Sequence, residues 1–367
     1  MSRIKSISTR IVRIPFEDGG RGEGITPTRW HILDNVLVRI EDEDGRVGWG
    51  EAFGYFCARA VAAAVEDMIA PQVIGRDIED IAAWNRATQQ ALHLFGRYGI
   101  TIFALSGVDI ALWDLKAKRD GKRLAGLIAA NPPESVAAYA SLVAYRDPDL
   151  AARYAGEAVA RGYEYIKLHE IAAEPIVAAR AAMGQGPGLA VDVNCNWSRE
   201  QASAMVPVLR EADVMWLEEP IFPPEDVATL SAIEAAGIAI GAGENACTAF
   251  AFEALISNIT FPQPSVTKVG GISVFLDIAA SARAAGRVLM PHSPYFGPGY
   301  FATLNLFAAL PETALFEYLY VTPEAFIGLD TPQPHGGRIA LPSGPGLGFA
   351  PDEAVVEHYL DRSWSAR

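Results

Sequence analysis

Short apolar runs that end in a polar residue recur between residues 136 and 317, and a helical pattern follows each run except the last. The polar end residues stand 21 to 27 positions apart. One unit of a parallel β/α barrel takes about 25–30 residues, and the carboxyl ends of its strands share one mouth. The spacing therefore predicts an α/β chain with a TIM-like barrel, whose mouth collects Lys167, Asp192, Glu218, Glu244, Ser265, His292 and Glu317.

The rest of the chain surrounds this barrel, which we expect over residues 131–320. Residues 1–130 combine β-branched strand patterns with later helical patterns, and they predict a separate α+β domain. Residues 321–367 are rich in Pro and Gly and are expected to pack against another part of the protein. Two loops, at 19–24 and 48–57, are candidates for a lid over a pocket. The barrel strands are expected at 136–141, 165–167, 189–192, 214–218, 238–244, 259–265, 288–292 and 314–317.

Charge and composition exclude several classes of protein. The chain carries 30 Lys and Arg against 44 Asp and Glu, a formal charge of −14, so a nucleic-acid partner is not expected. No apolar stretch approaches the roughly 20 residues of a membrane helix, and the N-terminus lacks a secretory apolar core. The 3 cysteines suit neither a disulfide framework nor a zinc finger. A cytoplasmic protein is therefore expected.

Three carboxylates define the predicted metal site. Asp192, Glu218 and Glu244 end three consecutive strands, so they should converge at the barrel mouth. Three converging carboxylates repel one another and are costly to desolvate unless a cation joins them. Hard oxygen ligands suit Mg²⁺, whereas zinc sites usually contain Cys or His. The sequence therefore predicts a Mg²⁺ site built from these three residues.

Several motifs resemble those of the enolase superfamily, in its mandelate racemase-like branch. They are VDVN at 191–194, WLEEP at 216–220, GEN at 243–245, KVGG at 268–271, SGVDIALWDLK at 106–116 and PSGPGLG at 342–348. The resemblance spans nearly the whole chain. It implies an N-terminal α+β capping domain, a (β/α)7β barrel, a C-terminal segment that packs back on the cap, and a homo-oligomer, either a dimer or an octamer. It also implies that the metal helps to remove the proton next to a substrate carboxylate by way of an enediolate.

The resemblance also implies roles for other residues at the mouth. The second strand of the family usually ends Lys-x-Lys, but here Lys167 is followed by Leu168 and His169, so His169 takes the position of the base. His292 matches the family histidine on the seventh strand, and Glu317 matches the acid that binds the substrate carboxylate. Ser265 stands where that histidine usually has an aspartate partner, so we expect His292 to be the weaker base.

Two reactions fit these residues. A dehydratase needs one residue to remove the α-proton and another to protonate the leaving β-hydroxyl, which suits the unequal pair of His169 and His292. Dehydration of a sugar acid or related hydroxy acid, giving a 2-keto-3-deoxy acid, is therefore the first expectation. A racemase, an epimerase or a cycloisomerase acting on a lactone or an anhydro sugar is the alternative. A non-catalytic binding protein is the third possibility, and it would be favoured by the loss of a metal ligand.

The substrate is expected to be a small carboxylate, but the sequence does not identify it. The residues that could contact it are aromatic or polar residues of the predicted mouth and lid. An aromatic surrounding suits a smaller or cyclic acid better than a long hydroxylated chain. The candidates are Asn194, Ser265, Lys268, Trp30, Tyr55 and Tyr295.

Overall fold

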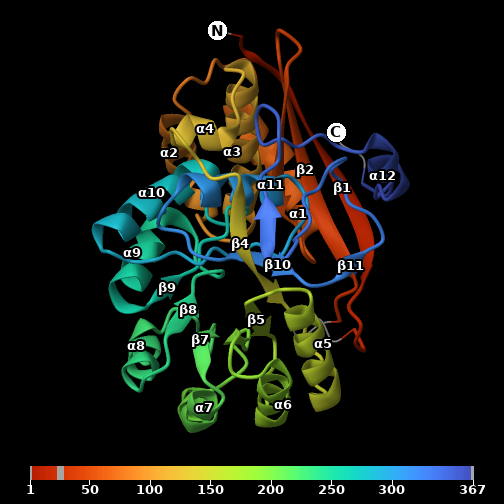
Figure 1. Ribbon diagram of the computed structural model, residues 1–367. Coiled ribbons are helices and arrows are strands. Elements are labelled where there is room, and N and C mark those ends of the chain that lie inside the picture. The colour runs from red at the N-terminus through yellow and green to blue at the C-terminus, as the bar shows by residue number, and fades with distance from the viewer. Residues whose placement is uncertain (1, 23–28, 365–367) are drawn as a thin grey trace.

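The computed structural model describes residues 2–22 and 29–364. A four-stranded sheet with the order β11-β1-β2-β3 forms one layer at the N-terminal end of the molecule (Figure 1). Gly45, with φ of 81°, closes the tight turn between β2 and β3 and donates its N–H to the carbonyl oxygen of Asp42. The strands are β1 (Ile4–Glu17), β2 (Ile32–Asp42), β3 (Val47–Phe53) and β11 (Thr322–Pro323).

Helices cover one side of this sheet, and α3 (Ile100–Arg119) packs directly on β3. Two glycines permit the close approach, because a Cβ on Gly50 would lie 2.0 Å from the carbonyl oxygen of Gly107. Helix α2 begins at an Asp80 cap, as helix starts commonly do. The other elements are α1 (Ala58–Ala64), η1 (Val65–Ile69), η2 (Ala70–Gln72), α2 (Ile81–Ala91), η3 (His93–Phe95) and α4 (Leu124–Ile128).

A parallel sheet in the order β10-β4-β5-β6-β7-β8-β9 forms the predicted barrel, and helices surround it (Figure 1). The fold prediction is confirmed. The strands are β4 (Ser135–Ser141), β5 (Tyr165–Leu168), β6 (Gly188–Asp192), β7 (Val214–Glu218), β8 (Ile240–Ala242), β9 (Phe261–Pro262) and β10 (Phe316–Leu319). The helices are α5 (Pro148–Ala160), α6 (Ala173–Met183), α7 (Arg199–Glu211), α8 (Val227–Ala235), α9 (Thr248–Asn258), α10 (Gly271–Ala284) and α11 (Pro298–Ala309).

The seventh barrel segment departs from the prediction. Residues 288–292 do not form a regular strand. Only isolated backbone hydrogen bonds connect them to β9 and to the residues that precede β10. Leu289 forms a single parallel bridge with Thr313, and the N–H of Met290 donates to the carbonyl of Pro262. Pro291 follows at once, and its missing N–H prevents the ladder from continuing. The barrel therefore closes with one irregular segment.

The C-terminal segment returns to both sheets. Strand β11 pairs with β1, and β12 (Arg338–Ala340) pairs antiparallel with β4 of the barrel. Helix α12 (Glu353–His358) lies beside β1, and Leu360 forms a bridge with Val12 (Figure 1). Within the described residues, no helix is long and apolar enough to cross a bilayer.

The capping sheet touches the barrel mouth through alternate residues at the end of β3. Gly299 N–H donates to Glu51 Oε2 at 2.8 Å, Phe53 N–H donates to Thr267 O at 3.4 Å, and the Tyr55 hydroxyl donates to Pro294 O. Glu51 is buried and satisfies the start of α11, whose own first residues offer no side-chain cap. This β3 latch (Glu51, Phe53 and Tyr55) fixes the position of the cap over the last barrel units.

Candidate active site

The predicted carboxylates converge at the carboxyl ends of three adjacent strands. Asp192 and Glu218 are opposite each other in the β6–β7 register, and Glu244 follows β8. One oxygen from each residue lies within 4.8 Å of the others. Asp192 and Glu218 are buried, and Glu244 is half-buried. The three therefore form a compact acidic cluster with the hard oxygen donors that a divalent cation prefers.

Lys167 is the penultimate residue of β5 and is fully buried among carboxylates. Its Nζ lies 2.6 Å from Glu218 Oε1, 2.8 Å from Glu317 Oε1 and 3.4 Å from Asp192 Oδ2. Burial opposes the charge of the ammonium, but the neighbouring carboxylates outweigh it and hold the pKa of Lys167 well above its usual range. Lys167 is therefore a permanent positive charge at the floor of the site.

His169 has a fixed orientation on the same side of the mouth. Its Nδ1 contacts the carbonyl oxygen of Leu142, and a carbonyl only accepts, so Nδ1 carries a proton. Its Nε2 lies 3.1 Å from Asp192 Oδ2. Burial lowers the pKa of His169, but the charge of Asp192 more than compensates and the net pKa is raised. The backbone contact therefore leaves Nε2 as the atom directed at the acidic cluster.

His292 faces the cluster from the irregular seventh segment. Its Nε2 lies 2.8 Å from Glu244 Oε2, whereas its buried Nδ1 has no hydrogen-bond partner among the described residues. Ser265 does not supply one, because its hydroxyl bonds to the hydroxyl of Tyr295 at 3.0 Å. Tyr295 in turn donates to the carbonyl of His292 at 3.0 Å. His292 thus lacks the second-nitrogen contact that fixes His169.

Glu317 on β10 lies between Lys167 and the loop after the seventh segment. Ser141 donates to its Oε1 at 2.8 Å, and the N–H of Ser293 donates to its Oε2 at 2.8 Å. Burial opposes ionisation, but the charges of Lys167 and His292 lower the pKa of Glu317 to about 2. Glu317 is therefore an ionised carboxylate with both oxygens engaged.

Two residues that orient Glu218 escaped the sequence analysis. Trp216 donates its indole N–H to Glu218 Oε2 at 3.0 Å, and Gln263 donates to the same oxygen at 2.8 Å. Trp216 stands two positions earlier on β7, so period-2 alternation could have placed it on the same face. Burial raises the pKa of Glu218 to about 7, with Asp192 adding to the effect and Lys167 opposing it. The cluster is thus short of positive charge.

Backbone strain collects just beyond the cluster. Asn194, Cys195 and Glu219 have φ values of 42°, 59° and 42°, a region that non-glycine residues rarely adopt. Asn194 donates to Asp192 Oδ1 at 2.8 Å through both its backbone and its side chain. Burial and the nearby charge of Glu244 raise the pKa of Glu219 to about 8. The strained turns therefore hold polar groups against the carboxylates.

A cavity of about 390 Å³ opens above the cluster, between the barrel mouth and the cap. Five aromatic rings contribute to its wall, and Trp30 and Tyr55 pack with their centroids 4.9 Å apart. Of the predicted contact residues, Ser265 and Tyr295 are fully buried and do not line it. Residues 23 and 24 of the predicted 19–24 lid lie outside the described residues. The lining residues are Trp30, Phe53, Tyr55, Phe56, Asn194, Cys195, Phe222, Pro224, Glu244, Asn245, Lys268, His292 and Pro294.

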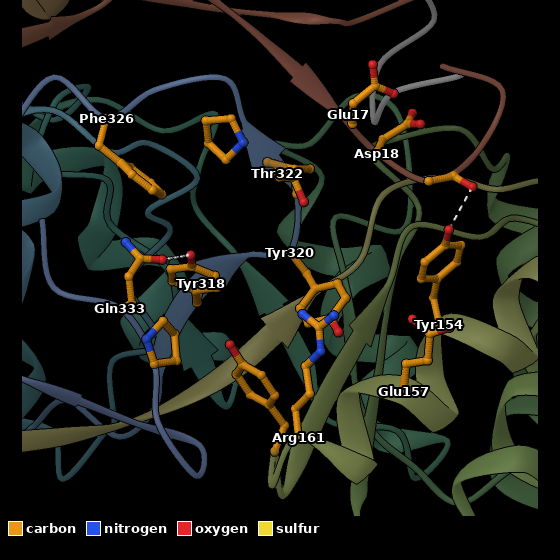
Figure 2. Close-up of a pocket in the computed structure, with 15 residues that line it drawn as sticks. Glu17, Asp18, Tyr154, Glu157, Arg161, Tyr318, Tyr320, Thr322, Phe326 and Gln333 are labelled. Carbon is orange, nitrogen blue, oxygen red and sulfur yellow. Dashed lines mark hydrogen bonds between the residues drawn. The ribbon is translucent and has the colours of Figure 1, made fainter. Parts of the chain in front are cut away.

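A second cavity of about 410 Å³ lies outside the barrel, between the end of β1, helix α5 and the C-terminal segment (Figure 2). Arg161 stands in it with its guanidinium 5.2 Å from the ring centre of Tyr320 (Figure 2). Tyr318 donates to Gln333 at 2.6 Å across another wall. No residue of the acidic cluster lines this cavity, so the chemistry gathers in the first one.

Known proteins resemble the chain over both parts of this fold. A family model described as the N-terminal domain of mandelate racemase and muconate lactonizing enzyme matches residues 26–129, and one described as enolase C-terminal domain-like matches residues 150–355. Arabinonate dehydratase of Saccharolobus solfataricus is 30% identical over 348 residues, which cover 91% of this chain and 92% of that protein. D-galactarolactone cycloisomerase of Agrobacterium fabrum is 31% identical over 365 residues, covering 89% and 96%.

The structure of a member of the enolase superfamily from Agrobacterium tumefaciens has the same architecture. It superposes with a TM-score of 0.87 at 27% identity, and the match covers 98% of this chain and 99% of that chain. The cap, the barrel and the C-terminal segment therefore all fall within the likeness.

Proposed function

The chain belongs to the mandelate racemase and muconate lactonizing enzyme family of the enolase superfamily, and from this premise we propose that it dehydrates a sugar acid or related hydroxy acid. The product would be a 2-keto-3-deoxy acid. The observation that carries the proposal is the unequal pair of histidines that flank the acidic cluster. His169 contacts Asp192 and has a fixed tautomer, whereas His292 contacts Glu244 and has a free second nitrogen.

We propose Mg²⁺ as the cofactor, held by Asp192, Glu218 and Glu244. Members of the superfamily bind a divalent metal, and two features of this chain fit one. The three carboxylates offer oxygens within 4.8 Å of one another, and Asp192 and Glu218 are buried, so water screens their negative charges poorly. When bound, the ion would supply Lewis-acid stabilisation of negative charge on the substrate carboxylate.

Lys167 and Glu317 would position that carboxylate. Lys167 brings a buried positive charge to the floor of the site, where charge interactions are poorly screened. Glu317 holds Lys167 at 2.8 Å and is itself fixed by Ser141 and Ser293. Charge that moves onto the substrate carboxylate as the α-proton leaves would thus meet a pre-placed ammonium.

His169 would remove the α-proton and His292 would complete the elimination. The Nδ1–H of His169 is engaged by Leu142, so Nε2 is the ring nitrogen that would take up the α-proton, and it would have to give up its 3.1 Å contact with Asp192 Oδ2 to do so. As the bond between the β-carbon and its hydroxyl breaks, His292 would give that oxygen a proton, and water would leave. The enol that remains takes up a proton at the β-carbon to become the keto acid.

A cycloisomerase is the second candidate, and the aromatic wall of the cavity favours it. Trp30, Phe53 and Tyr55 form a connected set, with ring centres 4.9 Å and 5.0 Å apart. Flat rings suit the C–H face of a cyclic substrate such as a lactone or an anhydro sugar. The elimination would be the same, with a ring oxygen as the leaving group.

We also propose the division of the chain into a capping domain at 1–130, a barrel at 131–320 and a C-terminal segment at 321–367. The pairing of β11 with β1 and of β12 with β4 supports this division, because the last segment joins the two earlier parts. Asn194 and Lys268 line the cavity and are the polar residues proposed to contact the substrate.

The decisive experiment incubates the protein with Mg²⁺ in D₂O and a panel of sugar acids, hydroxy acids and lactones. Formation of a 2-keto acid from an open-chain acid would support the dehydratase, and formation from a lactone or anhydro sugar would support the cycloisomerase. Exchange of the α-proton without a keto acid would point to a racemase or epimerase. A binding-only protein would show none of these reactions with any member of the panel.

Two variants then separate the roles of the histidines. His169→Asn should lose exchange of the α-proton and dehydration together, by about 10²–10⁴-fold. His292→Asn should lose dehydration but keep exchange, because it acts after the proton has left. Retention of exchange in His169→Asn and its loss in His292→Asn would reverse the assignment.

A further inference from the structure

Lys268 is a buried cation that forms no ion pair among the described residues. It is 7% exposed, lies in the turn after β9, and lines the cavity above the acidic cluster. Its ammonium forms no hydrogen bond or ion pair with any residue that the structure describes. A buried charge is normally paired, because desolvation is costly.

Aromatic rings of the cap hold Lys268 in place without neutralising it. Its Nζ lies 4.7 Å from the ring centre of Phe53 and 5.9 Å from that of Phe103. A cation–π contact attracts an ammonium but leaves its three donors unused. The β3 latch that carries Phe53 also bonds to Thr267, the neighbour of Lys268. The ammonium is thus pre-placed, and its donors remain available to the cavity.

The two lysines of the mouth stand on opposite walls. Lys167 lies near the end of β5 and Lys268 follows β9, and three strands separate β5 from β9 in the sheet order. With segment 288–292 completing a ring of eight, four strands apart means across the barrel. Lys167 already has Glu218, Glu317 and Asp192 within 3.4 Å, whereas Lys268 has no carboxylate at ion-pair distance among the described residues. The charge of Lys268 does help to lower the pKa of Glu244, but Glu244 is one of the three carboxylates proposed to hold the metal.

We propose that Lys268 binds a second carboxylate, at the end of the substrate away from the reacting carbon. The substrate class is therefore a dicarboxylic hydroxy acid, or a lactone of one, rather than a monocarboxylic sugar acid. This inference rests on the proposed function, which places the first carboxylate near Lys167. A distal hydroxyl could accept one hydrogen bond from Lys268, but only an anion cancels its charge.

The test compares matched pairs of acids that differ only at the distal end, such as galactarate with galactonate and glucarate with gluconate. We expect the wild-type protein with Mg²⁺ to prefer the dicarboxylate in kcat/KM. Lys268→Met should lower the ratio of the two kcat/KM values at least about 30-fold, as expected for removal of one member of a buried charge pair. Lys268→Arg should restore most of the ratio, and the exposed Lys122→Met should leave it unchanged.

Each outcome decides a different point. An equal loss for both acids in Lys268→Met would mean that the lysine acts on the shared end of the substrate, and this would overturn the inference. A wild-type preference for monocarboxylates would overturn it without any variant, even if Lys268→Met did not fold. Turnover of monocarboxylates alone would leave the dehydratase proposal intact, whereas no exchange with any acid would refute both.

Discussion

Glu51→Gln should remove a pH-dependent loss of stability at the contact between the cap and the barrel. Glu51 is fully buried in the β3 latch, and burial raises its pKa to about 7 although Gly299 N–H donates to it. An unfolded glutamate has a pKa of about 4.3, so the folded protein binds the proton more tightly. Tyr55 and Tyr295 face Glu51, and their raised pKa values keep both neutral below pH 9.

The difference between the folded and unfolded pKa of Glu51 determines how the stability of the protein changes with pH. A group with a raised folded pKa contributes its full stability below the unfolded pKa and loses it as the pH rises through the folded value. The difference between pKa values of about 7 and about 4.3, at roughly 1.4 kcal/mol per pKa unit, gives about 4 kcal/mol, of which about two thirds is lost between pH 5 and pH 8. The amide of the variant is neutral throughout and can still accept from Gly299.

Urea unfolding, followed by tryptophan fluorescence between pH 5 and pH 8, measures this effect. The free energy of unfolding of Glu51→Gln relative to wild type should rise by about 2–3 kcal/mol over that range. The difference isolates Glu51, because Asp109, whose burial raises its pKa to about 7, is present in both proteins. Glu43→Gln, at an exposed turn of the same sheet, is the control. A relative stability of Glu51→Gln that does not change with pH would refute the reasoning.

Two further perturbations test the packing and the metal site. Gly50→Ala should destabilise the protein by about 1–3 kcal/mol or more in thermal or urea unfolding, because its Cβ would meet the Gly107 carbonyl oxygen at 2.0 Å. Gly126→Ala, whose Cβ would have nothing within 4 Å, should leave the stability nearly unchanged. Equal losses of stability in the two variants would contradict this account. Gln263→Met should weaken Mg²⁺ binding about 10–100-fold by calorimetry, because Gln263 donates to Glu218 at 2.8 Å, and unchanged affinity would argue against Glu218 as a ligand.

The barrel and its acidic cluster were predictable because they depend on local periodicity. Each β/α unit repeats at nearly constant length, so residues such as Asp192 and Glu218 could be assigned to one mouth from spacing alone. The seventh segment was assigned as a strand for the same reason, but Pro291 interrupts its ladder. The length of the β/α repeat therefore predicts the position of a segment in the barrel, but it does not predict whether the segment forms the regular hydrogen bonds of a strand.

Contacts between distant segments could not be predicted in this way. The β3 latch joins Glu51 to Gly299, and Lys268 lies over Phe53, so each contact spans more than 200 residues. The orientation of Ser265 toward Tyr295 instead of His292 is likewise set by tertiary packing. A single sequence, read by itself, contains no periodic signal for such pairs.

The C-terminal segment has a consequence for how such proteins can be recombined. Because β11 completes the sheet of the cap while β12 pairs antiparallel with the first barrel strand, the cap is assembled from both ends of the chain. A chimera that exchanges only the first 130 residues with a relative would pair a foreign β1 with the resident β11 and Leu360. A clean exchange of the cap would need two crossovers, one before the barrel and one after it, so the cap and the C-terminal segment would be inherited together.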